Sequence, residues 1–155
     1  MLQWLKGLFQ QPQPAGPPQT LKRFNGDEPT ITKEMIVPAE GGWHIQTQDT
    51  QTIRLFEVAD PGVEQCFLSY RASMKSANVK SRVYLEMWCR LPGRGEFFSK
   101  GFHNALTGTN DWAAYEIPFY LRQNQKPDLI KLNVTIEGEG SVWLKDIELI
   151  YTPLA

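Results

Sequence analysis

Aliphatic or sulfur-containing apolar residues recur at every second position along two segments of this sequence, 82–91 and 129–137. Because successive side chains of a β-strand point to opposite faces, this pattern places the recurring residues of each segment on one face. In the first segment that face carries Val83, Leu85, Met87, Cys89 and Leu91. In the second it carries Ile130, Leu132, Val134 and Ile136. Both segments are therefore predicted to be half-buried strands of an antiparallel sheet.

Shorter segments with strand patterning occupy the rest of the chain after residue 20. Clusters of Gly, Pro, Asn and Asp that are typical of turns separate them, at 41–42, 60–62, 92–95, 108–111, 126–128 and 138–140. The predicted strands are 30–37, 43–45, 52–58, 65–73, 82–91, 95–102, 114–121, 129–137 and 141–151. Many short strands with no helical segment between them predict an all-β protein, specifically a jelly-roll antiparallel β-sandwich.

The last predicted strand changes its alternation part-way. Val142 and Leu144 share one parity, whereas Ile147 and Leu149 share the other. All four can face the core only if an extra residue is inserted between the two pairs. We therefore expect a β-bulge near 145–146.

Residues 1–20 differ from the rest of the chain. They contain a single charged residue, Lys6, and a Pro-rich stretch, QPQPAGPPQ. Residues 1–20 are therefore predicted to be a hydrophobic tail and linker, and 21–155 the β-sandwich domain. Within the tail, the helical spacing of Leu2, Leu5, Leu8 and Phe9 predicts a short amphipathic helix over 2–9. A helix this short is unstable alone, so it would dock on its own domain, on a protein partner or at a membrane interface.

Charge and motif content exclude several function classes. Sixteen Lys and Arg against seventeen Asp and Glu give a net charge of -1 with interspersed signs, so nucleic acid is not an expected partner. The sequence lacks a phosphate-binding glycine loop and the HExxH and GxSxG motifs. It also lacks an apolar run long enough for a membrane helix and the pattern of a secretory signal, so a cytoplasmic location is expected, with membrane association through the tail as an alternative.

The residue types that most often serve metal binding or catalysis are sparse. Cys66 and Cys89 lack the paired spacing of a zinc site, so two buried thiols are expected, with a disulfide as the alternative. His44 and His103 are isolated. Glu86 and a second strand carboxylate, Glu116, could form a glycosidase pair, but solvated strand-face carboxylates are far more common. We therefore expect a protein that binds rather than catalyses.

The face of 82–91 opposite the core alternates aromatic and charged residues, Tyr84, Glu86, Trp88 and Arg90. An aromatic ring can stack on the C–H face of a sugar, while carboxylate and guanidinium groups bond its hydroxyls. Lys131 and Asn133 would join this face if their strand lies in the same sheet. The six residues are the candidate ligand site. The alternative is an aromatic ladder that the N-terminal segment covers.

The stretches GTNDWAAYEIPFYL (108–121) and PDLIKLNVTIEGEGSVWLKDIELI (127–150) resemble the closing half of galactose-binding-like jelly rolls, a superfamily that includes many carbohydrate-binding modules. YLEMWCRLPGRGEFFSKG (84–101) is similar to the preceding strand pair in bacterial versions. The resemblance implies a non-catalytic module that recognises a carbohydrate or carbohydrate-like ligand. It also implies that Asp146 helps to bind a structural calcium, with Asp27, Glu28 or Glu34 as a further ligand. The alternative function is a protein-interaction or assembly module that docks through the tail helix and exposed aromatic residues.

Overall fold

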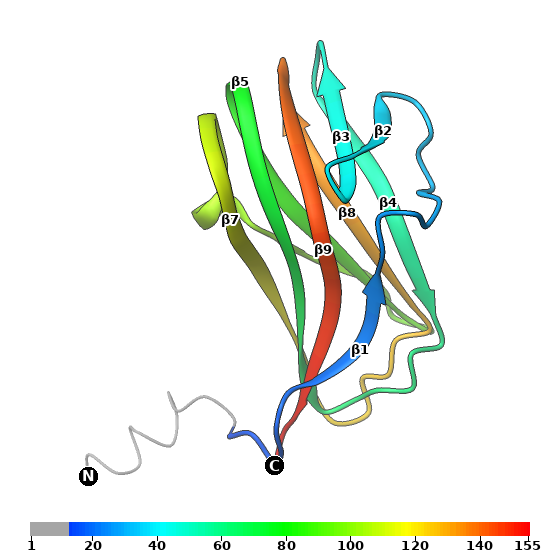
Figure 1. Ribbon diagram of the computed structural model, residues 1–155. Coiled ribbons are helices and arrows are strands. Elements are labelled where there is room, and N and C mark those ends of the chain that lie inside the picture. Colours follow the sequence, from blue (N-terminus) through cyan, green and yellow to red (C-terminus); the bar gives the residue numbers. More distant parts are fainter. Residues whose placement is uncertain (1–12) are drawn as a thin grey trace, which may run out of the picture.

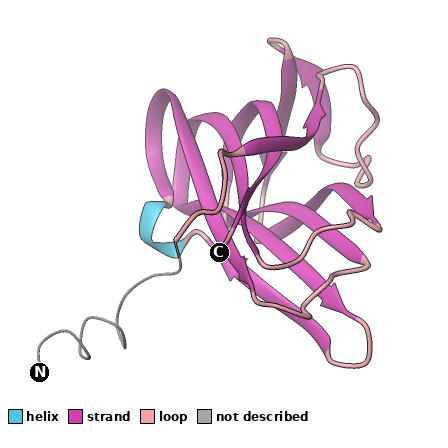
Figure 2. Cartoon of the chain, turned by 90° about the horizontal axis from the view of Figure 1, so that it is seen from below, coloured by secondary structure: helices cyan, strands magenta, loops and turns pink. Residues whose placement is uncertain are grey.

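A computed structural model of the chain describes residues 13–155, and these form an antiparallel β-structure of two packed layers (Figure 1). The strands are β1 (Gln19–Phe24), β2 (Ile36–Ala39), β3 (Gly42–Thr47), β4 (Gln51–Ala59), β5 (Cys66–Leu91), β6 (Gly95–Lys100), β7 (Leu106–Leu121), β8 (Leu129–Glu137) and β9 (Gly140–Pro153). A short 3-10 helix, η1 (Phe102–Asn104), precedes β7. Figure 2 shows that the described chain consists of strands and connecting loops, apart from this one short helix. The predicted all-β class is confirmed.

The long strand β5 belongs to both layers. Its first half pairs with β9 and β7, and its second half pairs with β8 and β6. The first layer also contains β1, β2 and β3, and the second contains β4 beside β8. A single sheet thus curls over itself through β5 and encloses the core between its two halves, which gives the jelly-roll β-sandwich.

The bend in β5 lies at Asn78, whose φ is 54°. Before it the even-numbered residues of β5 are buried, for example Met74, and after it the odd-numbered residues are buried, for example Val83. The left-handed conformation of Asn78 therefore shifts the alternation by one residue as the strand passes from one layer to the other. The sequence predicts two separate strands here, 65–73 and 82–91, because the polar residues between them resemble a loop.

The predicted bulge in the last strand is confirmed. Ser73 of β5 pairs with Lys145, whereas Arg71 pairs with Glu148, so β9 carries one extra residue between these two pairs. Asp146 lies in that interval with a φ of 54°. The residues on either side of the bulge, Leu144 and Ile147, are both fully buried.

The core lies between the two layers and follows the predicted alternation. Met87, Leu132 and Val134, all from the predicted apolar faces, have no exposed surface. Tyr70, from the first half of β5, is also fully buried, and its hydroxyl donates to the backbone carbonyl of Asn133 on β8, at 3.2 Å. This bond ties the first layer to the second through the middle of the core.

Three element boundaries differ from the sequence predictions. Only 36–37 of the predicted strand 30–37 lie in a strand, β2, because residues 30–35 cross to the other layer, where the N–H of Ile31 bonds the carbonyl of Leu55. β7 begins at Leu106 rather than at 114, because it pairs past the bend of β5. β1 begins at Gln19, inside the predicted linker, because pairing with β9 holds it as a strand.

The predicted helix over 2–9 lies outside the described residues. At residues 13–15 the described chain runs beside its own C-terminus: the N–H of Ala15 bonds the carbonyl of Pro153, and the N–H of Ala155 bonds the carbonyl of Gln13. The division into a tail (1–20) and a domain (21–155) stays a prediction. Within residues 13–155, no helix has the length and apolar character needed to cross a membrane.

Candidate functional site

The outer face of the second layer brings most of the predicted ligand residues together. β8 pairs directly with β5, so Asn133 lies opposite Glu86 and Lys131 lies opposite Trp88. The sequence analysis made their joint membership of the site conditional on this pairing, and the register fulfils the condition. Side chains from neighbouring strands extend each pair into a row across the sheet.

The first row has a buried polar centre. Glu86 is 5% exposed and Asn133 is 6% exposed, although both point away from the core. The side-chain amide of Asn133 donates to the carboxylate of Glu86 at 3.0 Å, and Lys100 on β6 lies 3.4 Å from the same carboxylate. Burying a carboxylate is costly unless it is paired and hydrogen-bonded, and these two contacts compensate the charge of Glu86. The row continues to Arg54 on β4.

The second row contains an aromatic pair. Trp88 on β5 lies opposite Phe98 on β6, with their ring centroids 5.1 Å apart and an interplanar angle of 52°. Lys100 lies above both rings, 4.7 Å from the centroid of Phe98 and 5.8 Å from that of Trp88. Phe98 is 54% exposed, so the pair offers flat apolar surface to the solvent. On the other side of Trp88 lies Lys131, which forms an ion pair with Glu96 at 2.8 Å.

The two rows border a cavity of about 360 Å³ on this face. We call it the Trp88 site, and its lining residues are Thr52, Arg54, Glu86, Trp88, Glu96, Lys131 and Asn133. Its charged side chains are paired with opposite charges: Glu86 with Lys100, Glu96 with Lys131, and Arg54 with Glu57. The site therefore combines an aromatic edge, Trp88 and Phe98, with a polar floor, Glu86 and Asn133, and its charges are balanced.

Two of the predicted ligand residues do not line this cavity. Tyr84 is 6% exposed, because Phe102 of η1 packs edge-on against its ring at a centroid distance of 4.8 Å. The guanidinium of Arg90 is held by Asp128, through bonds of 2.8 and 3.3 Å to its two carboxylate oxygens. These bonds from Arg90 lower the pKa of Asp128 below its ordinary value. The covered-ladder alternative thus applies to Tyr84, with η1 as the covering segment rather than the N-terminal one.

The contributions of β4 and β6 to the Trp88 site were not predicted from the sequence. Thr52 and Arg54 alternate with the buried residues Ile53 and Leu55, so their outward direction was readable from the sequence. Their position beside β8 was not readable, because strand order is a tertiary property. Phe98 lies within a predicted strand, but only the pairing of β6 with β5 places it against Trp88.

The remaining predicted groups lie elsewhere. Asp146 is exposed at the bulge of β9, and residues 13–155 contain no group of three or more His, Cys, Asp and Glu side chains able to share a metal ion. Calcium needs several oxygen ligands, and calcium at Asp146 stays a prediction. Cys66 and Cys89 are both free and buried, and burial raises their pKa values to about 11 and about 12. Such thiols are largely protonated at neutral pH.

The two carboxylates considered as a glycosidase pair occupy different layers. Glu86 faces outward from the second layer, next to Asn133. Glu116 lies on β7 opposite Arg71, in the first layer, where it accepts a hydrogen bond of 2.7 Å from the hydroxyl of Ser69. A glycosidase pair has to flank one bond of a substrate, and these two carboxylates do not share a face.

Comparison with solved structures places the fold among known β-sandwich domains. The CBM22-1 xylan-binding domain of Paenibacillus barcinonensis Xyn10C matches with a TM-score of 0.58 and 9% identity, over 88% of this chain and 97% of that one. The chain has the fold of a carbohydrate-binding module. A family 30 carbohydrate-binding module also matches, with a TM-score of 0.49, 14% identity, and coverage of 85% of this chain and 97% of that chain. No protein-family model and no curated protein matches the sequence. The resemblance noted in the sequence is thus confirmed at the level of the jelly-roll fold.

Proposed function

We propose that the protein is a non-catalytic binding module that recognises a carbohydrate at the Trp88 site. The observation that carries the proposal is the buried pair of Glu86 and Asn133 beside an exposed aromatic edge. A sugar ring has an apolar C–H face and a rim of hydroxyls, and it needs both kinds of surface side by side. The geometry provides both within one cavity of about 360 Å³.

The polar floor suits hydroxyl groups in particular. Glu86 has two oxygens, which together accept about four hydrogen bonds, and Asn133 and Lys100 use only part of this capacity. A ligand hydroxyl that donates to this carboxylate forms a charge-assisted bond, the stronger kind. Because Glu86 and Asn133 are already buried and bonded to each other, little ordering is required when a ligand binds.

The balanced charge of the site favours a neutral glycan. Each acidic side chain on this face has a basic partner, as in the pair of Glu96 and Lys131. An acidic or basic sugar would have to displace one member of such a pair and leave the other uncompensated. The likeness of the fold to a domain described as xylan-binding supports testing neutral plant polysaccharides first.

A glycan array followed by calorimetry tests the proposal with the full chain. Removing the aromatic platform by Trp88→Ala should weaken binding by roughly 1–3 kcal/mol, the value typical of stacking on flat ligands. Glu86→Gln should weaken it by about 1 kcal/mol, because a charge-assisted bond becomes a weaker neutral one. Trp112→Ala is the matched control, since Trp112 is a partly buried indole on β7, outside the Trp88 site. It should leave binding at this site unchanged.

A second variant separates binding from folding. Met87 is the chain neighbour of Trp88 but faces the core with no exposed surface, so Met87→Ala should lower the free energy of unfolding by about 2–5 kcal/mol. Trp88→Ala should cost less, because its side chain is partly exposed. If Trp88→Ala unfolds the protein as badly as Met87→Ala, the indole is a structural residue and the proposal is wrong. A blank array with retained self-association would instead favour the alternative, an assembly module.

A further inference from the structure

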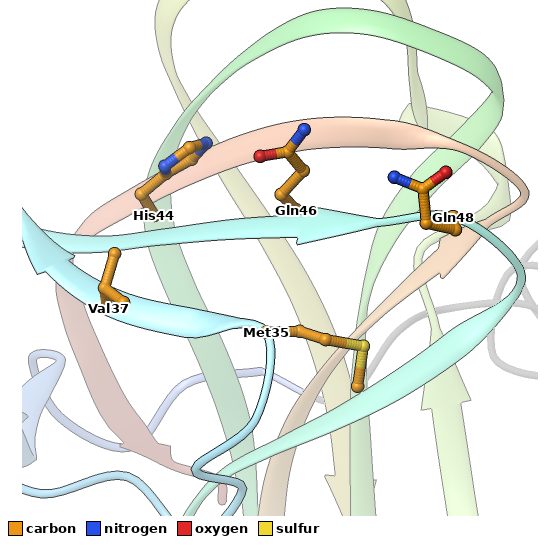
Figure 3. A pocket seen from close by; sticks show the side chains of 5 residues that line it. All are labelled: Met35, Val37, His44, Gln46 and Gln48. Atoms are coloured by element: carbon orange, nitrogen blue, oxygen red, sulfur yellow. The ribbon is translucent and has the colours of Figure 1, made fainter.

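A second cavity lies on the outer face of the first layer, away from the Trp88 site. It has a volume of about 430 Å³ and is lined by Met35, Val37, His44, Gln46 and Gln48. Figure 3 shows the imidazole of His44 and the two amide groups standing on the same side of β3, with Val37 and Met35 on the adjoining segment. Met35 is 40% exposed and Val37 is 55% exposed, so the cavity is open to solvent.

Packing behind the cavity fixes the orientation of His44. Its ring stacks on the indole of Trp143 from β9, with a centroid distance of 4.3 Å and an interplanar angle of 6°. The ammonium of Lys75, on β5, lies 4.9 Å from the centroid of the same indole and forms an ion pair with Glu40 at 2.8 Å. Trp143 is thus in contact with a ring and a cation, and both are held in place. The stacked ring of His44 thus forms part of the cavity wall.

One atom of this cavity has an unmet hydrogen-bonding capacity. Among residues 13–155, the Nε2 atom of His44 is the only buried side-chain nitrogen or oxygen that has no hydrogen-bond partner. Buried polar atoms of folded proteins are almost always bonded, so this atom is an exception. Because it is buried, a ligand in the open cavity bonds it only if a neighbouring side chain moves aside. A neutral imidazole nitrogen can bond a hydroxyl group in either direction, according to its tautomer.

The chemistry of the lining indicates which ligand fits. None of the five lining residues is an acid, a lysine or an arginine, so a charged ligand finds no counter-charge there. Val37 and Met35 supply apolar contact, while Gln46 and Gln48 each offer a donor and an acceptor group. We propose that this cavity is a second binding site for a neutral sugar ring. The proposal rests on the proposed function in that both sites take the same class of ligand.

Two sites on the outer faces of different layers would have a consequence for larger ligands. They face away from each other, so one glycan strand bound at the Trp88 site leaves the His44 cavity free for another strand. The protein would then cross-link polysaccharide chains, and its apparent affinity for a multivalent polymer would exceed that of either site.

Nuclear magnetic resonance tests the second site directly, because Gln46 and Gln48 carry side-chain amide signals inside it. The probes are D-xylose, D-glucose, D-galactose and xylohexaose, titrated into the labelled full chain. We expect saturable shifts of both amide signals in the wild type, and the same shifts in Trp88→Ala. In the double variant Gln46→Ala, Gln48→Ala, the shift of the His44 ring signals should need at least about tenfold more sugar. Gln123→Ala, at an exposed turn, is the matched control and should leave the titration unchanged.

The outcomes distinguish this inference from the proposed function. If signals near Trp88 shift while those of Gln46, Gln48 and His44 do not, the second site is overturned and the proposed function stands. If only the second set shifts, the Trp88 site is wrong and the second site stands. If no probe shifts either set, both are overturned. A soluble xylan that precipitates with the wild type, but with neither Trp88→Ala nor the double variant, would support cross-linking.

Discussion

Trp88 and Met87 are adjacent in the sequence and lie on opposite faces of one sheet. Because side chains alternate along a strand, Met87 lies in the core and Trp88 is partly exposed. Met87 therefore stabilises the fold, whereas Trp88 is available for ligand binding. Glu86 shows that direction alone does not decide exposure. It points away from the core but is covered to 95% by neighbouring side chains, and its bond with Asn133 makes that burial tolerable.

Residue-scale chemistry also gives a prediction for His44. Burial lowers the pKa of its imidazole below the ordinary value, Lys75 adds to the effect and Glu40 opposes it. The folded-state pKa then lies below the unfolded one, so the unfolded chain binds more protons between the two values. The contribution of the neutral His44 imidazole to the free energy of unfolding is complete above about pH 6.5. It is lost as the pH falls through the folded-state pKa.

A comparison with His44→Gln isolates this contribution. We expect the melting temperature of the wild type to fall further than that of the variant between about pH 7.5 and pH 5, because only the wild type must protonate a partly buried ring. Scanning calorimetry at both pH values measures the difference. A larger loss in the variant would show that the His44 imidazole gains a favourable interaction when charged.

Among the elements, β5 has the largest part in shaping the site. Its second half carries Glu86 and Trp88, and its first half carries Tyr70, whose hydroxyl bonds the backbone of Asn133 from the core side. Burial and the nearby carboxylate of Glu86 raise the pKa of Tyr70 above its ordinary value. The second half of β5 thus supplies Glu86 to the polar floor, and the first half supplies the Tyr70 hydroxyl that bonds the backbone of Asn133. The bend at Asn78 allows one strand to do both.

The bulge of β9 provides a prediction at the element scale. Asp146 adopts a φ of 54°, a conformation that glycine accepts freely and β-branched residues do not. Asp146→Val should lower the free energy of unfolding by roughly 1–2 kcal/mol, whereas Asp146→Gly should retain wild-type stability. Urea unfolding of the two variants measures both values.

The same variants test calcium at Asp146. If a structural calcium depends on this carboxylate, Asp146→Gly will be destabilised as well, and EDTA will lower the melting temperature of the wild type alone. If the backbone conformation is what matters, EDTA will leave all three proteins unchanged.

At the scale of the molecule, the start and end of the described chain close the first layer together. β1 pairs with the second half of β9, and residues 13–15 lie beside the C-terminus (Figure 1). Phe24, the last residue of β1, is 4% exposed and stacks on Phe56 of the other layer at a centroid distance of 4.1 Å. The N-terminal strand therefore contributes to the common core and is more than a connector.

Two truncations separate the roles of the N-terminal residues. Deleting 1–24 removes β1 and the Phe24 side chain, and it should lower the free energy of unfolding by at least about 3 kcal/mol. Deleting 1–12 retains β1 and should leave the melting temperature nearly unchanged, while abolishing any binding of residues 2–9 to a partner or membrane. Thermal unfolding and liposome co-sedimentation measure the two effects. A large loss of stability in the shorter truncation would show instead that the tail packs on its own domain.

The alternation along the chain determined the all-β class, the core faces of β5 and β8 and the bulge near Asp146, because local side-chain direction follows from the backbone period alone. It also indicated Glu86, Trp88, Lys131 and Asn133 as outward-facing. Only the tertiary structure decided which of these residues share a cavity, since strand order and register arise from pairings between residues far apart in the sequence. The burial of Tyr84 under η1 and the unpaired nitrogen of His44 were likewise set by packing between distant segments, which a period of two does not encode.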